Sequence, residues 1–236
     1  MRRMFRLVWL FVLPALAMPA LTRAGDVALM KACPGLAAWA KTHPRHSQEP
    51  SAENDVADAA VGDPALSKQL AARYVADQQA RDALSATGMR DEAKMKAMLA
   101  VDADNLPWLR ALIARQGFPT SAQVGKRGVE HAWMLVQHAD RDPALQSKVL
   151  VQLMPRLKSG DIAKSDVALL TDRVLVAQGK SQRYGSQFVQ DSHGQFVPKP
   201  IEDTGHLDLH RAQMDLMPLV DYRCLLQFEN TPHAAR

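Results

Sequence analysis

The sequence predicts a mainly α-helical fold, an irregular multi-helix domain with one small β-hairpin near the C-terminus. Apolar residues recur at helical spacing through most of residues 64–177, as they do on the buried side of amphipathic helices. Further along, residues 187–190 and 195–197 flank Ser192-His193-Gly194, which is typical of a hairpin turn. Together these patterns indicate a helical protein with a single two-stranded element.

Two Asp-Pro pairs mark helix starts, because Asp is a good N-cap and proline is favoured at the first helical position. Asp63-Pro64 predicts a helix to about residue 85, and Asp142-Pro143 predicts one to about residue 158. A clean apolar face predicts a helix over about 125–138, formed by Val129, Ala132, Trp133 and Val136. Further helices are expected within 25–41 and over about 90–104, 105–117, 165–178 and 207–216.

These patterns divide the chain into four parts. Residues 1–24 are predicted to be a signal peptide, and residues 25–63 an N-terminal segment and linker that is rich in polar residues and proline. Residues 64–224 form the expected helical domain, and residues 225–236 a tail.

The net charge of +4 gives no support for nucleic-acid binding. Four of the 29 basic residues lie within residues 1–24, a stretch without acidic residues. The remaining 25 basic residues balance the 25 acidic ones, so the rest of the chain is neutral. Proteins that bind nucleic acid usually carry a basic surface, and we therefore expect no nucleic-acid partner.

The first 24 residues have the organisation of a secretory signal. Arg2, Arg3 and Arg6 precede an uncharged, mostly apolar run over residues 7–21. That run is shorter than the about 20 residues that cross a bilayer. Cleavage after Ala17, Ala20 or Ala24 is expected, which would give a periplasmic or secreted protein without a membrane span. An uncleaved N-terminal anchor is the alternative.

Cys33 and Cys224 are the two cysteines of the chain. An oxidising compartment favours a disulfide between them, and this pairing would close most of the chain into one loop. Two unrelated thiols are the alternative interpretation.

Three polar clusters between residues 131 and 187 are the candidates for a functional site. They are Gln137-His138-Ala139-Asp140, Asp172-Arg173 and the stretch from Gln182 to Gln187. Asp172 shares a helical stripe with Leu169 and Val176, and a charge on such a face requires a partner elsewhere. Arg173 cannot be that partner, because adjacent residues of a helix do not face each other.

The residue types of these clusters suit two kinds of chemistry. His138 with Asp140 or Asp172 could act as an acid/base pair. The amides, phenol and guanidinium groups that come later in the chain suit the binding of a polar ligand. We predict that His138, Asp140, Asp172, Arg173, Gln182 and Tyr184 converge, with Gln187 and Arg211 as further binding residues. A purely structural network of buried polar groups is the alternative.

Metal and cofactor sites are not expected. His131 and His138 are seven residues apart, whereas a zinc-binding pair on one helix is spaced by four. The chain also lacks a G-x-S-x-G motif, a phosphate-binding loop, a C-x-x-C pair and the dinucleotide glycine pattern. A site that combines His138, Asp140 and a distant ligand stays open.

A series of short motifs resembles a bacterial family, domain of unknown function 6624, over about residues 100–222. The motifs are Trp108-Leu109, Gly117-Phe118-Pro119, Val124-Gly125, Ala132-Trp133, the Gln137–Asp140 cluster, Asp172-Arg173, Gln182-x-Tyr184-Gly185-Ser186-Gln187, Pro198-x-Pro200-Ile201 and Arg211. The chain departs from the pattern at Asp215, where Gly is expected, and at Ser186, where Thr is commoner. The resemblance implies a domain boundary and assigns no activity.

These observations favour a periplasmic binding or interaction module, with a polar ligand or an envelope protein as its partner. A hydrolase that acts on an envelope polymer is the second hypothesis, with His138 and either Asp140 or Asp172 as the acid/base pair. The third is a structural envelope protein in which the polar residues hold the helices together.

The signal sequence leads to the first testable prediction. Mass spectrometry of the periplasmic or secreted fraction should find a chain that begins between Met18 and Gly25, because cleavage removes the apolar run. An intact Met1 in a soluble cytoplasmic pool would contradict export.

Overall fold

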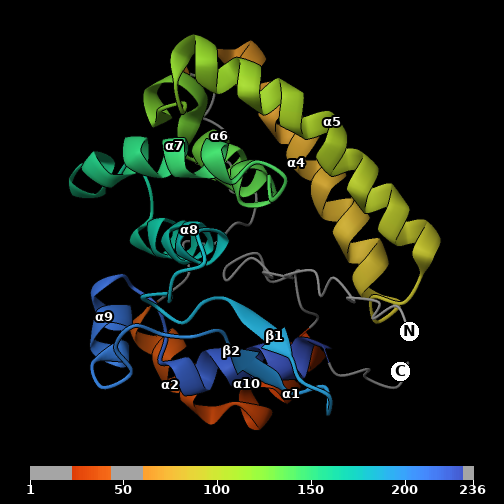
Figure 1. Ribbon diagram of the computed structural model, residues 1–236, viewed down its shortest axis with the longest axis vertical. Coiled ribbons are helices and arrows are strands. Elements are labelled where there is room, and N and C mark those ends of the chain that lie inside the picture. Colours follow the sequence, from red (N-terminus) through yellow and green to blue (C-terminus); the bar gives the residue numbers. More distant parts are fainter. Residues whose placement is uncertain (1–22, 44–60, 231–236) are drawn as a thin grey trace. The chain divides into compact units, whose positions relative to one another are not determined.

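The computed structural model describes residues 23–43 and 61–230 (Figure 1). Helices predominate in these residues, and the strands β1 (Phe188–Gln190) and β2 (Phe196–Pro198) form an antiparallel hairpin. The predicted fold class is therefore confirmed. The predicted signal peptide, apart from Arg23 and Ala24, and most of the predicted linker lie outside the described residues.

The described chain forms two compact units. Unit 1 contains residues 23–43 and 171–229, and unit 2 contains residues 61–170. The boundary falls within one helix, α8 (Lys164–Ala177). The N-terminal segment therefore belongs to the same unit as the last part of the chain.

Unit 2 is built from helices, of which α4 packs against α5 and α6. Its elements are α4 (Pro64–Ser85), α5 (Glu92–Gln116), α6 (Ser121–Gln137), α7 (Pro143–Leu153), a 3-10 helix (Met154–Lys158) and the first half of α8. Both predicted Asp-Pro starts are confirmed. The Asp63 carboxylate accepts a hydrogen bond from Leu66 N, and the Asp142 carboxylate accepts one from Leu145 N, each over 2.9 Å.

The predicted interruption at residues 105–107 is wrong, because α5 continues through Pro107. A proline inside a helix costs about 3 kcal/mol through its lost hydrogen bond and its ring. On either side, α5 buries Leu106, Leu109 and Leu112, and each buried leucine contributes about 1.5–3 kcal/mol. Burial of the apolar face therefore outweighs the local preference of proline.

The apolar face predicted for α6 is confirmed, since Val129, Ala132, Trp133 and Val136 are all buried. The helix begins earlier than expected, at Ser121, and is kinked at Gly125, whose φ is 75°. The Gln123 side chain holds this start by accepting a hydrogen bond from Thr120 N over 2.9 Å.

Unit 1 combines the N-terminal segment with the C-terminal part of the chain. Its elements are α1 (Arg23–Ala32), α2 (Pro34–Thr42), the second half of α8, β1, β2, α9 (Leu207–Gln213) and α10 (Leu219–Asn230). Val189 lies opposite Val197 in the hairpin. One apolar cluster joins these parts through Leu29, Cys33, Leu36, Phe188, Phe196, Met217, Tyr222, Leu225 and Leu226.

Two C-terminal features differ from the sequence prediction. Helix α9 ends at Gln213 instead of residue 216, and α10 extends to Asn230, through residues that were expected in the tail. Leu225 and Leu226 are each only 3% exposed, so their burial in the core of unit 1 explains why the chain stays helical there.

The predicted disulfide is confirmed between Cys33 and Cys224, whose Cα atoms are 5.9 Å apart. It links the start of α2 to α10. This covalent link and the apolar cluster both attach the N-terminal segment to the end of the chain.

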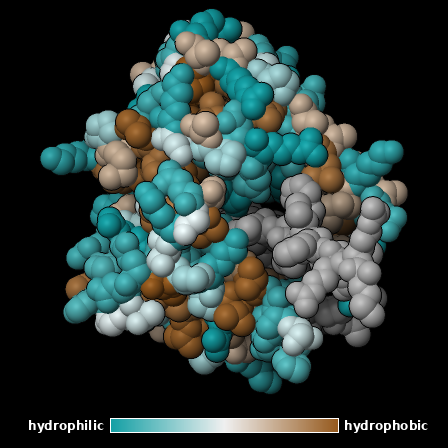
Figure 2. All heavy atoms as spheres, in the orientation of Figure 1, coloured by the Kyte–Doolittle hydropathy of each residue, from teal (hydrophilic) through white to brown (hydrophobic). Residues whose placement is uncertain are grey.

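The visible surface is mixed in character, with hydrophilic side chains among separate apolar areas (Figure 2). Within residues 23–43 and 61–230, no helix combines the length and apolar character that crossing a membrane requires.

Candidate functional site

Buried polar side chains form one cluster in each unit. In unit 1 they surround residues 182–187, here called the 182–187 loop, which comes directly after α8. In unit 2 they surround His138, at the end of α6. The two clusters hold their buried charges in different ways.

Asp172 anchors the 182–187 loop. Its side chain is completely buried, and one carboxylate oxygen, Oδ1, accepts hydrogen bonds from Arg183 N over 2.7 Å and Tyr184 N over 2.9 Å. The other, Oδ2, accepts one from Ser186 N over 2.8 Å. Burial raises the pKa of Asp172, and these backbone donors act in the opposite direction. The compensation that the sequence demanded for this charge thus comes from backbone amides.

The Gln182 side chain closes the same loop upon itself. Its Nε2 donates hydrogen bonds to the carbonyl oxygens of Gln187, over 3.0 Å, and Lys199, over 2.9 Å. Its Oε1 accepts one from Gln187 N over 2.8 Å. Because backbone groups use both ends of this buried amide, Gln182 supports the loop, and its predicted role in binding stays a prediction.

Arg211 supplies the third anchor. It is 1% exposed, and its Nε donates to Met217 O over 2.6 Å while its Nη1 donates to Tyr184 O over 2.5 Å. Its guanidinium lies 5.2 Å from the centre of the Tyr222 ring, within the range of a cation–π contact. Burial lowers the pKa of Arg211, whereas Tyr222, Asp208 and Asp172 act to raise it.

Gly185 is required by the shape of the loop. Its φ is 66°, in the left-handed region that favours glycine. A Cβ at this position would also lie 3.1 Å from Leu219 Cδ1 and 3.2 Å from Ile201 Cδ1. The backbone can therefore approach these side chains closely only because residue 185 has none.

Three side chains of this loop have polar groups that are not described as bonded to the loop backbone. Arg183 is exposed and forms an ion pair with Glu202 over 2.7 Å. Tyr184 is half-buried, which raises its pKa, while Arg183 beside it acts to lower it. Gln187 donates from Nε2 to Ser186 Oγ over 3.1 Å, but its fully buried Oε1 has no hydrogen-bond donor.

In unit 2, His138 pairs with Asp77 of α4. His138 Nδ1 lies 2.8 Å from Oδ2 and 3.0 Å from Oδ1 of Asp77, which is completely buried. Arg81 lies 2.9 Å from the same carboxylate and 2.8 Å from that of Asp102. Burial by itself would raise the pKa of Asp77, but His138 and Arg81 bring that pKa below its ordinary value.

Asp77 was missed in the sequence, although a signal was present. Leu70, Asp77 and Leu84 are spaced by seven residues and are all completely buried, so they lie on one stripe of α4. An aspartate within a leucine stripe has the property that singled out Asp172. Leu66, Leu70 and Tyr74 are sufficient to predict the helix, and the same stripe continues through Asp77 to Leu84.

The six residues that were predicted to converge come from both units, so the convergence of the whole set stays a prediction. Its unit 1 members Asp172, Gln182 and Tyr184 meet at the 182–187 loop. Arg173 in the same unit is 5% exposed. In unit 2, the structure describes Asp77 as a partner of His138. The exposed Asp140 accepts a hydrogen bond from Gln146 Nε2 over 3.4 Å.

A third feature, also in unit 2, is a stack of Tyr74 on His131 with ring centres 4.3 Å apart. Burial, and then the charge of Arg127, lowers the pKa of His131 to about 4. Its Nδ1 is buried without a hydrogen-bond partner. His131 is therefore neutral at pH 7 and packs as an aromatic ring. Within the described residues, no three His, Cys, Asp or Glu side chains are placed to hold a metal ion.

Comparison with known proteins identifies the family. Residues 64–231 match the model of the family of unknown function DUF6624, a range that includes all three polar clusters. The chain therefore belongs to this family, as its motifs indicated. No curated protein and no solved structure matches the chain.

Replacing the loop anchor should loosen the 182–187 loop. Asp172→Ala leaves the N–H groups of Arg183, Tyr184 and Ser186 without their acceptor, and we expect a loss of about 3–5 kcal/mol in the free energy of unfolding. Hydrogen exchange at the amides of Arg183, Tyr184 and Ser186 should accelerate together. Asp172→Asn, which keeps one acceptor oxygen, is the matched control and should lose less. Unchanged exchange at these amides in Asp172→Ala would contradict the anchoring role.

His131 should make stability depend on pH. Its pKa falls from 6.5 in the unfolded chain to about 4 in the folded protein, so between these values the unfolded chain binds more protons. The free energy of unfolding should therefore decrease by about 3 kcal/mol as the pH is lowered from 7 to 4. His131→Phe keeps the stacked ring without the titrating group. Urea unfolding at pH 7, 5.5 and 4 should show a flatter dependence for this variant, and identical slopes would refute the assignment.

Proposed function

We propose that this chain is an exported binding module in which Tyr184 and Gln187 of the 182–187 loop hold a polar ligand. The Arg-rich N-terminus with its short apolar run and the Cys33–Cys224 disulfide support export. The ligand class that suits the site is a sugar or a peptide from the cell envelope.

The observation that carries the proposal is the orphan oxygen of Gln187. Its Oε1 is buried and has no hydrogen-bond donor. The Asp172 carboxylate and the Gln182 amide, which hold the same loop, do have hydrogen-bond partners. A buried acceptor without a donor costs about 1–3 kcal/mol. Gln187 is completely buried, so a ligand reaches this oxygen only if a neighbouring side chain, such as that of the half-buried Tyr184, moves aside. A hydroxyl of a sugar or an amide N–H of a peptide would then supply the donor and recover this free energy on binding.

The rigidity of the loop adds to this argument. Asp172, Gln182 and Arg211 fix its backbone from three sides, so binding does not have to order it. The entropy cost of immobilising a loop is a large part of the cost of association, and a preorganised loop avoids it. Arg183 and Glu202, which are exposed next to Tyr184, add one charge of each sign for a zwitterionic or polar partner.

The test compares side chains that touch the ligand with one that does not. We expect a thermal-shift screen of envelope oligosaccharides and short peptides to identify a ligand. For this ligand, Gln187→Ala and Tyr184→Phe should weaken the affinity about tenfold or more, since each loses a buried hydrogen bond. Gln195→Ala, an exposed glutamine of the hairpin turn, is the matched control and should bind as the wild type does. Equal affinity for all three variants would contradict the proposal.

One observation favours the hydrolase as a second candidate. The Asp77 carboxylate binds Nδ1 of His138, and in a neutral imidazole this arrangement directs the lone pair to Nε2, as a general base requires. The partner would then be Asp77 instead of Asp140 or Asp172. Against this, the ion pairs of Arg81 with Asp77 and Asp102 are also what the structural hypothesis expects.

Catalysis and structure can be separated at His138. If the chain is a hydrolase, His138→Gln should abolish the release of fragments from a labelled envelope polymer while the circular dichroism spectrum is unchanged. In a structural network, the same variant should lower the unfolding temperature, and no hydrolysis should be found with the wild type.

A further inference from the structure

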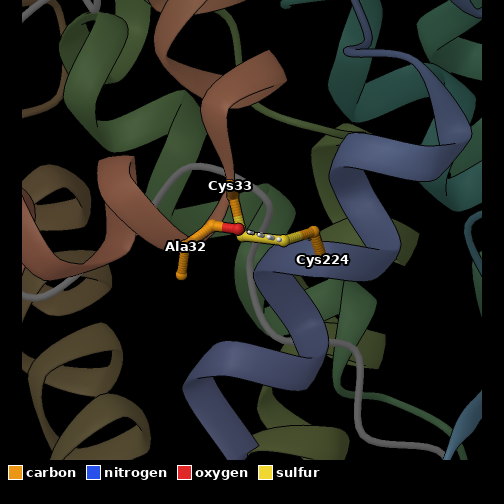
Figure 3. Close-up of a disulfide and its surroundings, with 3 residues drawn as sticks. All are labelled: Ala32, Cys33 and Cys224. Carbon is orange, nitrogen blue, oxygen red and sulfur yellow. Dashed lines mark hydrogen bonds between the residues drawn. A yellow bond between two sulfur atoms is a disulfide. The ribbon is translucent and has the colours of Figure 1, made fainter.

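Figure 3 shows the disulfide between Cys33 and Cys224, with Ala32 beside it. Its two sulfur atoms differ in their surroundings. Cys33 is 1% exposed and belongs to the apolar cluster of unit 1. Cys224 lies on α10 and is only partly buried. Its Sγ is 3.5 Å from the carbonyl oxygen of Ala32, the last residue of α1. A reagent from solution therefore meets Cys224 before Cys33.

We propose that Cys224 Sγ is a thiol-exchange site, at which a small thiol or a reducing dithiol opens the disulfide, with Cys33 as the buried resolving thiol. The N-terminal segment that contains α1 and α2, here called the strap, is covalently tied to α10 until this reaction takes place. Cys33 lies outside residues 64–231, so the site links the matched region to a segment that precedes it.

The reaction is an ordinary thiol–disulfide exchange. A thiolate attacks Sγ of Cys224, a new S–S bond forms there, and the old bond breaks with its electron pair going to Cys33. Cys224 then carries a mixed disulfide, and Cys33 takes up a proton. The second thiol of a dithiol next attacks the sulfur of the reductant in the mixed disulfide. This step leaves both cysteines as thiols and the dithiol as its own disulfide.

Exposure decides which sulfur is attacked, because exchange requires access along the S–S axis. The surroundings of Cys33 decide how long its released thiolate lasts. Cys33 occupies the N-cap position of α2, but its side chain makes no cap hydrogen bond there. It is buried in the apolar cluster, and burial in apolar surroundings disfavours a thiolate. A released Cys33 thiolate is therefore short-lived, because it is protonated or re-forms the disulfide.

Opening the disulfide changes how the strap is held. Leu29 and Leu36 are 0% and 2% exposed, so apolar contacts still attach the strap to the core after the bond is broken. These contacts keep Cys33 close to Cys224 and make the exchange reversible. After reduction the strap is held in unit 1 by apolar contacts, and it can be released.

The wild-type protein gives the first test. The folded protein is incubated with reduced glutathione, quenched in acid and digested without reduction, and the glutathione adduct is located by mass spectrometry. We expect the adduct on the peptide that contains Cys224, in at least about tenfold excess over the Cys33 peptide, because buried thiols react slowly. An adduct found mainly on Cys33, or formed no faster than the protein unfolds, would overturn the proposal.

A pair of single variants gives an independent test. Cys33→Ser leaves Cys224 as a free thiol, and Cys224→Ser leaves Cys33. With iodoacetamide, Cys224 should react about tenfold faster or more than Cys33, as long as circular dichroism shows both variants folded. Equal rates in two folded variants would contradict the assignment. If either variant does not fold, the adduct position in the wild type decides the question by itself.

Discussion

The burial of one carboxylate, that of Asp172, is the constraint on which the candidate site of unit 1 depends. A completely buried charge must be compensated, and here three backbone amides of the 182–187 loop provide the compensation. The loop in return takes a shape that brings these amides to one point, which requires the left-handed conformation at Gly185. The Arg211 guanidinium also holds this loop, by donating a hydrogen bond to the carbonyl oxygen of Tyr184.

Unit 2 compensates its buried carboxylate, Asp77, by a different method. Its partners are side chains, His138 and Arg81, and so the compensation depends on their charge. Such a network responds to pH, because protonation of Asp77 at low pH removes its attraction to both cations. The Asp172 anchor uses backbone dipoles that do not titrate. Its three donors therefore stay the same over the whole pH range, and Asp172 itself, whose pKa burial raises, is the one group of this anchor that changes charge.

The sequence predicted what depends on local pattern and missed what depends on tertiary context. Asp63 and Asp142 as N-caps and the apolar stripe of α6 are local features, and the structure confirms them. Helix α5 was divided at Pro107 because the gain from burying Leu106 and Leu109 does not show in a local pattern. The partners of Asp172 could not be found, since backbone amides leave no mark in the sequence. Asp215 is instructive, because its φ of 54° explains why a glycine is expected there.

Among the described residues, the buried side-chain amides of Gln137 and Gln187 both have atoms without a hydrogen-bond partner, but they lie in different surroundings. Gln137 is 1% exposed, and neither Oε1 nor Nε2 of its amide has a partner. It lies on α6 within an unbroken run of buried residues from Ala132 to Ala139. Gln187 is completely buried too, but it lacks only a donor, and its loop contains the exposed Arg183 and the half-buried Tyr184. The position of Gln187 in a loop with exposed polar side chains therefore supports the proposed ligand contact, and Gln137 on α6 lacks that support.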